Sequence, residues 1–147
     1  MILEIHGAAM NHSEDVRQID AVIHKFFSCF DNRNGRGPSA AAVTELFLAD
    51  SVIARATEGA FELTRPGPFA EPRVELLRNG RLVDFHEWET GAATDVQGRL
   101  AARRSRYAKE GRLDGQPYAG AGTKFFQLIK EADTWRILSV AWEDDPI

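Results

Sequence analysis

The sequence lacks what several protein classes require. Cys29 is the single cysteine in 147 residues, so no internal disulfide can form and a reducing compartment is expected. The apolar runs fall far short of the roughly 20 residues that a membrane-spanning helix needs. Lys and Arg number 18 against 22 Asp and Glu, giving a net charge of −4, which argues against nucleic acid as the main partner.

Targeting and metal-binding signals are also missing. The segment Met1–His6 has no basic region leading into an apolar stretch, so no export signal is predicted. No His, Cys, Asp or Glu residues have the spacing of metal ligands. We therefore expect a cytoplasmic protein without metal or other cofactor, and with neither membrane nor nucleic acid as a partner.

The composition is that of one globular domain. Hydrophobic residues make up 44% of the chain and charged residues 27%, both close to the average of folded proteins. A chain of this length can bury a hydrophobic core that is large enough to fold without disulfides or structural metal ions. We predict a flexible N-terminal tail over residues 1–13 and a single domain over residues 14–147.

Helices are predicted in the first part of the chain. Ser13 is a suitable N-cap for a helix whose apolar residues recur every three or four positions up to Phe30. The segment Asp31–Gly35 predicts its end. Ser39 is expected to cap a second helix that reaches Asp50.

Strands dominate the rest of the chain. A strand pair, 51–57 and 60–64, is predicted around a turn at Glu58–Gly59, followed by a short helix over 69–77. Four strand-length runs come next, at 82–92, 99–109, 123–130 and 135–143. Short connections favour an antiparallel meander, with a longer break over 111–122 that is a candidate lid. Helices followed by an antiparallel sheet are typical of the α+β class.

Alternation along the strands separates two faces. It places His86 and Trp88 on one face of the first run and Glu87 on the other. In the run 123–130, Phe125 and Phe126 give both faces apolar bulk. Because the helices can cover only one face, we predict a homodimer packed through the sheet.

The register between the first two runs has two solutions. Pairing Glu89 with Arg104 matches opposite charges along both strands and places His86 beside Tyr107. A bulge at Gly98 would shift the pairing by one residue and undo this assignment.

This order of elements resembles the nuclear transport factor 2-like superfamily, in particular its SnoaL-like branch of small bacterial proteins. The likeness covers roughly residues 14–145. It is carried by the end of the first helix, the entry to the first strand and the last two strands, in the segments 21–35, 46–53, 122–129 and 135–142.

The resemblance implies a cone, in which a strongly curved sheet wraps around the first helix and leaves an apolar cavity at its open end. Relatives include ketosteroid isomerase, scytalone dehydratase, polyketide cyclases, small subunits of ring-hydroxylating dioxygenases and non-catalytic carrier or dimerisation domains. The enzymes place an Asp, His or Tyr in the cavity, where apolar surroundings shift its pKa for proton transfer. The helix-borne Tyr of ketosteroid isomerase has no counterpart in the predicted first helix.

His86 is the predicted catalytic residue, as a general acid or base in an aromatic setting. The alternative is a strand histidine at a dimer interface or a partly solvated edge. Glu87 is expected to pair with an arginine of the neighbouring strand, but buried without that partner it would be a plausible base.

The predicted ligand is a small apolar or aromatic molecule, isomerised, dehydrated or cyclised without a cofactor. Arg104 facing inward would hold a carboxylate, whereas pairing with Glu is the simpler role. The alternative function is a non-catalytic dimerisation or ligand-binding module. The expected ligand-binding residues are Phe27, Trp88, Arg104, Tyr107, Phe126 and Trp142.

Overall fold

A long helix opens the chain and four long strands close it. The computed structural model describes residues 2–146, with side chains described from His12 onward. Between the long helix and the last four strands lie a single 3-10 turn, two further helices and a strand pair. The elements are α1 (Ile2–Ser28), the 3-10 turn (Arg33–Gly35), α2 (Ala40–Thr44), β1 (Phe47–Thr57), β2 (Ala60–Thr64), α3 (Pro66–Arg78), β3 (Leu82–Gln97), β4 (Leu100–Leu113), β5 (Gln116–Glu131) and β6 (Thr134–Asp144).

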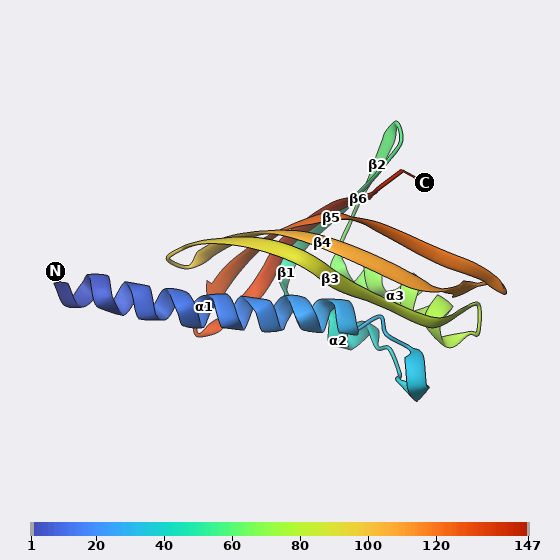
Figure 1. The fold of residues 1–147 in the computed structure, drawn as a ribbon, viewed down its shortest axis with the longest axis horizontal. Helices are drawn as coiled ribbons and strands as arrows, with labels where there is room; N and C mark the ends of the chain where they lie inside the picture. Colours follow the sequence, from blue (N-terminus) through green and yellow to red (C-terminus); the bar gives the residue numbers. More distant parts are fainter. Residues whose placement is uncertain (1, 147) are drawn as a thin grey trace.

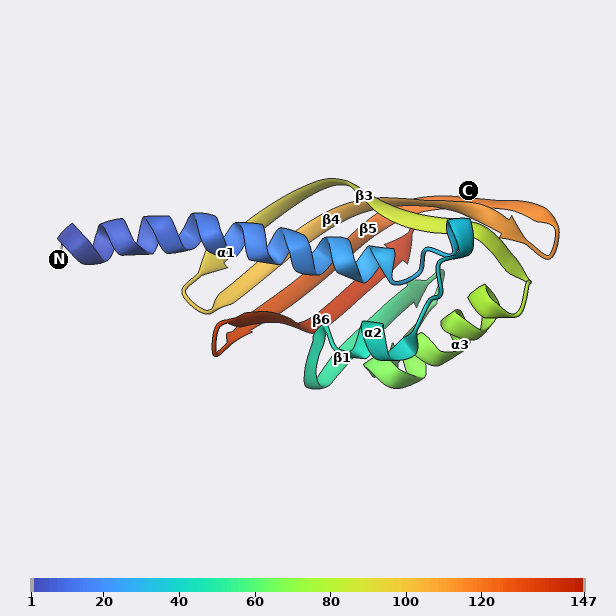
Figure 2. The same cartoon turned by 90° about the horizontal axis from the view of Figure 1, so that it is seen from below.

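The strands form one six-stranded sheet in the order β2-β1-β6-β5-β4-β3. Strands β3 to β6 make the predicted antiparallel meander, and β1 joins β6 in parallel. The sheet curls without closing, and the three helices lie against its concave side (Figures 1 and 2). This confirms the predicted α+β class and the curved, mainly antiparallel sheet.

Aromatic packing joins α1 to the concave face of the sheet. Phe26 is 1% exposed, and its ring meets those of Phe30, Phe47 and Phe126 edge-on at centroid distances of 5.4–6.1 Å. Edge-to-face pairs of this kind each add about 0.5–1.5 kcal/mol beyond the area that they bury. Helix α1 therefore fills one end of the curled sheet and leaves space at the other end, beside α3.

The helix limits differ from the predicted ones. Helix α1 begins at Ile2 rather than at Ser13, and no proline interrupts it over this length. That residues 1–13 are flexible stays a prediction. Ser39 does cap α2, accepting a hydrogen bond from the Ala42 amide, but the helix ends at Thr44. Phe47 is recruited into the sheet opposite Ile137, and this pairing outweighs local helix propensity.

The strands are longer than predicted. The segment 111–122, predicted as a break and a candidate lid, belongs to β4 and β5, so both interpretations are wrong. The chain reverses at Asp114–Gly115, where both residues have positive φ, as a two-residue hairpin turn of type I′ requires. The gap between the predicted runs 82–92 and 99–109 likewise shrinks to a tight turn at Gly98–Arg99.

Bulges overturn the predicted register. Glu89 lies opposite Tyr107, and His86 lies opposite Glu110, because the pairing of β3 with β4 shifts on either side of residues 86–89. The charge-matched register is therefore wrong. A further shift in β6, at Leu138, breaks the simple alternation there. As a result Trp135, Ile137, Val140 and Trp142 are all buried on the inner face.

Asn32 ties together the elements around the open end of the sheet. Its Nδ2 donates hydrogen bonds to the carbonyls of Leu77 in α3, at 3.0 Å, and Leu82 in β3, at 2.7 Å. Its Oδ1 accepts from the Phe85 amide at 2.8 Å. One side chain following α1 thus holds α3 and β3 in place.

Replacing Asn32 should destabilise this junction. In Asn32→Ala, two carbonyls and one amide lose their partners, and the free energy of unfolding should fall by about 2–4 kcal/mol. Asn32→Asp keeps the acceptor for the Phe85 amide but sets a carboxylate oxygen against the Leu77 and Leu82 carbonyls, so it should not rescue the stability. Urea denaturation measures both, and a loss below about 1 kcal/mol in Asn32→Ala would show that water replaces the bonds.

Candidate functional site

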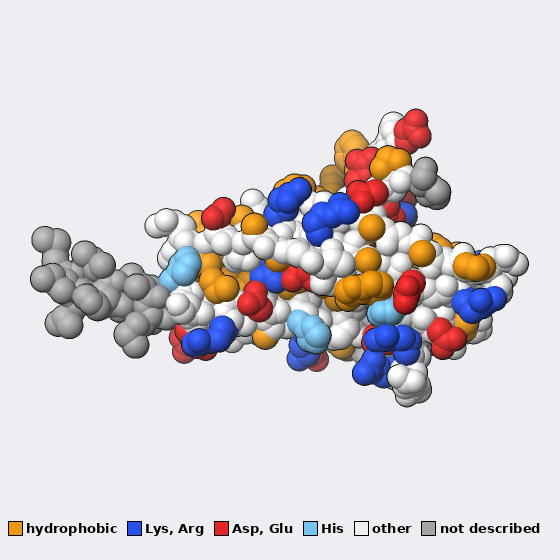
Figure 3. Space-filling view, viewed as in Figure 1, with side chains coloured by type: hydrophobic (Ala, Val, Ile, Leu, Met, Phe, Trp, Pro, Cys, Tyr) orange, Lys and Arg blue, Asp and Glu red, His pale blue; other side chains and the backbone are white. Residues whose placement is uncertain are grey.

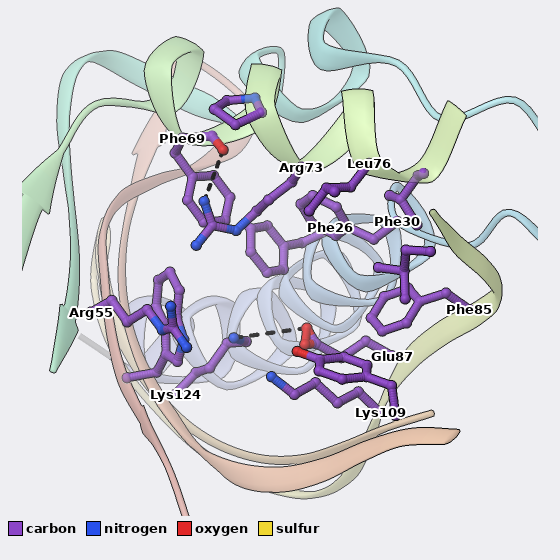
Figure 4. Close-up of a pocket in the computed structure, with 15 residues that line it drawn as sticks. Phe26, Phe30, Arg55, Phe69, Arg73, Leu76, Phe85, Glu87, Lys109 and Lys124 are labelled. Atoms are coloured by element: carbon purple, nitrogen blue, oxygen red, sulfur yellow. Dashed lines mark hydrogen bonds and ion pairs between the residues drawn. The ribbon is translucent and has the colours of Figure 1, made fainter. Parts of the chain in front are cut away.

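A cavity of about 290 Å³ opens between α3, the end of α1 and the concave face of the sheet (Figure 4). Most of its wall is aromatic or aliphatic, as in small-molecule sites generally. Its size is at the low end of such sites and suits a ligand of one or two rings. The apolar lining consists of Phe26, Phe30, Phe69, Pro72, Leu76, Leu77, Leu82, Phe85 and Trp142.

Charged side chains enter this apolar wall from five elements. Four are cationic and one is a carboxylate, and the Tyr118 ring completes the wall. The charged residues are Arg55 of β1, Arg73 of α3, Glu87 of β3, Lys109 of β4 and Lys124 of β5. An apolar wall carrying this many ionisable groups indicates a site for chemistry or charge recognition rather than structural packing.

Lys124 is the most buried of these groups. The residue is 3% exposed, and its Nζ lies 4.2 Å and 4.1 Å from the ring centroids of Tyr107 and Trp142. The Oε1 of Glu87 is 3.8 Å from Nζ, beyond hydrogen-bonding distance. Burial lowers the pKa of Lys124 to about 8, although the nearby carboxylate of Glu87 opposes the shift. A fraction on the order of one-tenth of the amine is then neutral at pH 7.

Asp144 neutralises the neighbouring lysine. It accepts a hydrogen bond from the Tyr107 hydroxyl and another from Lys109 Nζ at 2.9 Å. Burial would raise the pKa of Asp144, but these hydrogen bonds outweigh it and hold the pKa below its usual value. Burial also works to lower the pKa of Lys109, yet the bond to Asp144 raises it overall. Lys109 therefore stays charged and paired, while Lys124 forms no hydrogen bond to any carboxylate among the described residues.

Close packing fixes the position of the Tyr107 side chain. Burial, followed by the hydrogen bond to Asp144, raises the pKa of its hydroxyl, which keeps it protonated. A Cβ at Gly122 would collide with that hydroxyl, so only glycine fits at this point of β5.

Arg73 lies on the helical side of the cavity. Its guanidinium is 4.0 Å from the Phe69 ring centroid and donates one hydrogen bond, at 3.0 Å, to the Phe69 carbonyl. Within the described side chains, 12–146, no ion pair joins it to a carboxylate, and burial lowers its pKa. Figure 4 shows it across the cavity from Lys124.

The predicted ligand-binding residues separate into two groups. Trp142 lines the cavity, and Tyr107 lies directly behind it, with its ring against Lys124. Phe27 and Phe126 are 2% and 1% exposed and belong to the core beneath the cavity.

His86, Trp88 and Arg104 are not in the cavity wall. The ring of His86 stacks on Trp88 at 4.3 Å, with its Nε2 4.0 Å from Glu110. Arg104 is exposed on β4. The alternation of β3 directs Glu87 into the cavity and therefore turns both neighbouring positions away from it. The catalytic role predicted for His86 gains no support from this cavity.

The inward position of Lys124 could have been predicted from the sequence. Lys124 shares its strand face with Phe126 and Leu128, both 1% exposed, so a charged residue occupies an inward position. Glu87 was considered as a buried base, and the structure places it beside Lys124 rather than an arginine. Arg73 had no such signal, because its inward orientation depends on where α3 crosses the sheet.

The described part of the chain carries neither a metal-binding cluster nor a membrane-spanning helix. No group of three or more His, Cys, Asp or Glu residues there could hold a metal ion. None of its helices combines the length and apolar character needed to cross a membrane.

Solved structures share this architecture. A nuclear transport factor 2-like protein with a cystatin-like fold from Novosphingobium aromaticivorans has a TM-score of 0.72 and 17% identity, covering 93% of this chain and 86% of its own. A Kribbella flavida protein has a TM-score of 0.72 and 16% identity, covering 92% and 93%. The hexachlorocyclohexane dehydrochlorinase LinA-type3 of Novosphingobium barchaimii has a TM-score of 0.72 and 14% identity, covering 94% and 91%.

No protein-family model and no curated protein matches the sequence. The structural matches nevertheless agree on one architecture over nearly the whole chain. The chain therefore has the nuclear transport factor 2-like fold, as the resemblance implied.

Lys124 should make stability depend on pH. Below pH 8 the folded protein carries a buried charge, whereas between pH 8 and 10.5 only the unfolded chain keeps the proton, so the wild type gains stability as the pH rises. The stability of the wild type relative to Lys124→Met should therefore rise by about 2 kcal/mol between pH 7 and pH 10. Urea unfolding at both pH values measures this difference.

Lys25→Met, at an exposed position of α1, is the matched control. Its stability difference from the wild type should change little between the two pH values. An equal pH dependence in both variants would contradict the assignment to Lys124.

Proposed function

We propose that this protein binds a small, largely apolar organic molecule in the cavity and moves a proton on it by acid–base chemistry. The observation that carries the proposal is the amine of Lys124, buried in an aromatic wall 3.8 Å from the Glu87 carboxylate. A lysine with a depressed pKa is a competent base near neutral pH.

The geometry assigns each side chain a role. The neutral amine of Lys124 accepts a proton from carbon, and Glu87, with the face of the Tyr107 ring, stabilises the ammonium that forms. Asp144 keeps Lys109 charged at the edge of the same wall, where it favours negative charge developing on the substrate. The apolar wall excludes water and strengthens these interactions.

Isomerisation, dehydration and cyclisation of small carbonyl compounds all use such a proton abstraction. Loss of hydrogen chloride, the reaction named for the Novosphingobium barchaimii neighbour, also removes a proton from carbon. The shared fold supports a cavity of this kind, and the residues within it support the chemistry.

Proton abstraction can be tested without the natural substrate. In D₂O, the wild type should accelerate deuterium incorporation next to the carbonyl of 2-tetralone, as followed by ¹H NMR. The acceleration should rise with pH and level off above about 8, because the deprotonated amine is the base. Lys124→Met should lose about 100-fold of this rate or more, the usual scale of a general base.

Two controls separate binding from catalysis. Leu76→Trp fills the cavity while keeping every charged side chain and should abolish both binding and exchange, whereas Arg78→Trp, at an exposed position of the same helix, should change neither. Ketone binding that Leu76→Trp blocks, without accelerated exchange, would indicate a non-catalytic binding module. Absence of binding would contradict the proposal.

We also propose that two copies pair through the outer face of the sheet. Phe125, Leu138 and Val52 are 57%, 37% and 41% exposed on the adjacent strands β5, β6 and β1. The β1–β2 hairpin adds Phe61 and Leu63, and Figure 3 shows hydrophobic side chains gathered where this hairpin rises from the body. Exposed apolar surface of this extent on neighbouring elements is typical of an interface.

Light scattering after size exclusion tests the dimer. The wild type should have twice the chain mass at micromolar concentration, and Phe125→Glu should be monomeric, because burying an unpaired carboxylate is unfavourable. Arg78→Glu, on the exposed side of α3, should remain dimeric. A monomeric wild type would rule out the pairing.

A further inference from the structure

The cavity wall carries more positive than negative charge. Arg55, Arg73, Lys109 and Lys124 face only Glu87 within the lining, and Asp144 just behind it. Two positive charges remain without a carboxylate when all six groups are ionised, and one remains when Lys124 is neutral, as it must be to accept a proton. The whole chain has a net charge of −4, so this excess is a local property of the cavity.

The excess is concentrated at Arg73. Lys109 is bonded to Asp144 at 2.9 Å, which also lies 3.7 Å from Arg55, and Lys124 faces Glu87. The Arg73 guanidinium instead lies 4.0 Å from the Phe69 ring centroid and 6.0 Å from that of Trp142, and among the described residues Glu87 and Glu62 attract it only from beyond ion-pair distance. A guanidinium has five N–H donors, and within the described part of the chain only the Phe69 carbonyl accepts a hydrogen bond from one of them.

We propose that the ligand is an aromatic or alicyclic monocarboxylate, whose carboxylate binds Arg73 while its ring packs against Phe30 and Phe85. This inference rests on the proposed function and specifies its substrate class. The planar fork of arginine matches a carboxylate with two parallel hydrogen bonds. The aromatic wall supplies the contact area for the ring.

The charge count favours one negative charge over two. Glu87 lies inside the same cavity and repels a second anionic group near Lys124. Lys109 is committed to Asp144, so a dianion would lack a second free cation. The carboxylate at Arg73 also leaves the far end of the ligand directed toward Lys124, where Figure 4 shows the amine facing the cavity.

Matched ligands test this selectivity. Isothermal titration of the wild type with 2-naphthoate and with its neutral counterpart 2-naphthamide should give at least 10-fold tighter binding of the carboxylate. The dianion 2-naphthyl phosphate should bind more weakly than 2-naphthoate. Equal affinities for carboxylate and amide in the wild type would overturn the inference, whatever the variants do.

Variants locate the binding group. Arg73→Gln should weaken 2-naphthoate at least 10-fold and change 2-naphthamide less than twofold, whereas Arg73→Lys should keep most of the preference. Glu87→Gln should tighten 2-naphthoate, because it removes the opposing charge. Arg78→Gln, one turn further along α3 and exposed, should bind both ligands like the wild type.

The outcomes distinguish the two proposals. If both ligands bind equally and Leu76→Trp blocks both, the cavity binds small molecules but does not select a carboxylate, and only the inference fails. If neither binds, or if Leu76→Trp changes nothing, the proposed function fails together with it. If Arg73→Gln lowered the affinity for both ligands equally, Arg73 would act only through packing on Phe69.

Discussion

The contact between Phe26 of α1 and Phe126 of β5 sets the shape of the whole molecule, because it closes one end of a sheet that curls but does not join its edges. The helix cannot fill the other end as well, and the space left there becomes the cavity. Lys124 lies two residues before Phe126 on the same strand and the same face, at the boundary between the aromatic core and the cavity. One strand therefore supplies both the core that stabilises the fold and the amine that defines the site.

The environment of that amine depends on how the other charges are arranged. Asp144 could have paired with either lysine, but it takes the hydroxyl of Tyr107 and the ammonium of Lys109. Lys124 is left against two ring faces and a carboxylate that stands too far away to form a hydrogen bond. The pairing of one lysine thus keeps the other available, and a buried amine with an incomplete partner is less stable but more reactive.

Sequence patterns predicted the architecture better than the site. Helical periodicity, the Ser39 cap and the turn at Glu58–Gly59 depend on neighbours along the chain, so they could be read locally. The faces of β3 and β6 could not, because bulges near Asp84 and at Leu138 break the period of two that any such assignment assumes. His86 was predicted to be catalytic because of its chemistry, whereas the alternation of side chains along the strand is enough to place Lys124 on the inner face.

The bulge at Leu138 has a consequence for how such cavities tolerate changes in strand length. It adds one unpaired residue to β6, between Ile137 and Ser139, which both keep partners in β5. Deletion of that residue would restore strict alternation and leave Trp142 on the inner face beside Lys124. A codon can therefore be gained or lost at this bulge while the lining of the binding site and the fold that carries it both persist.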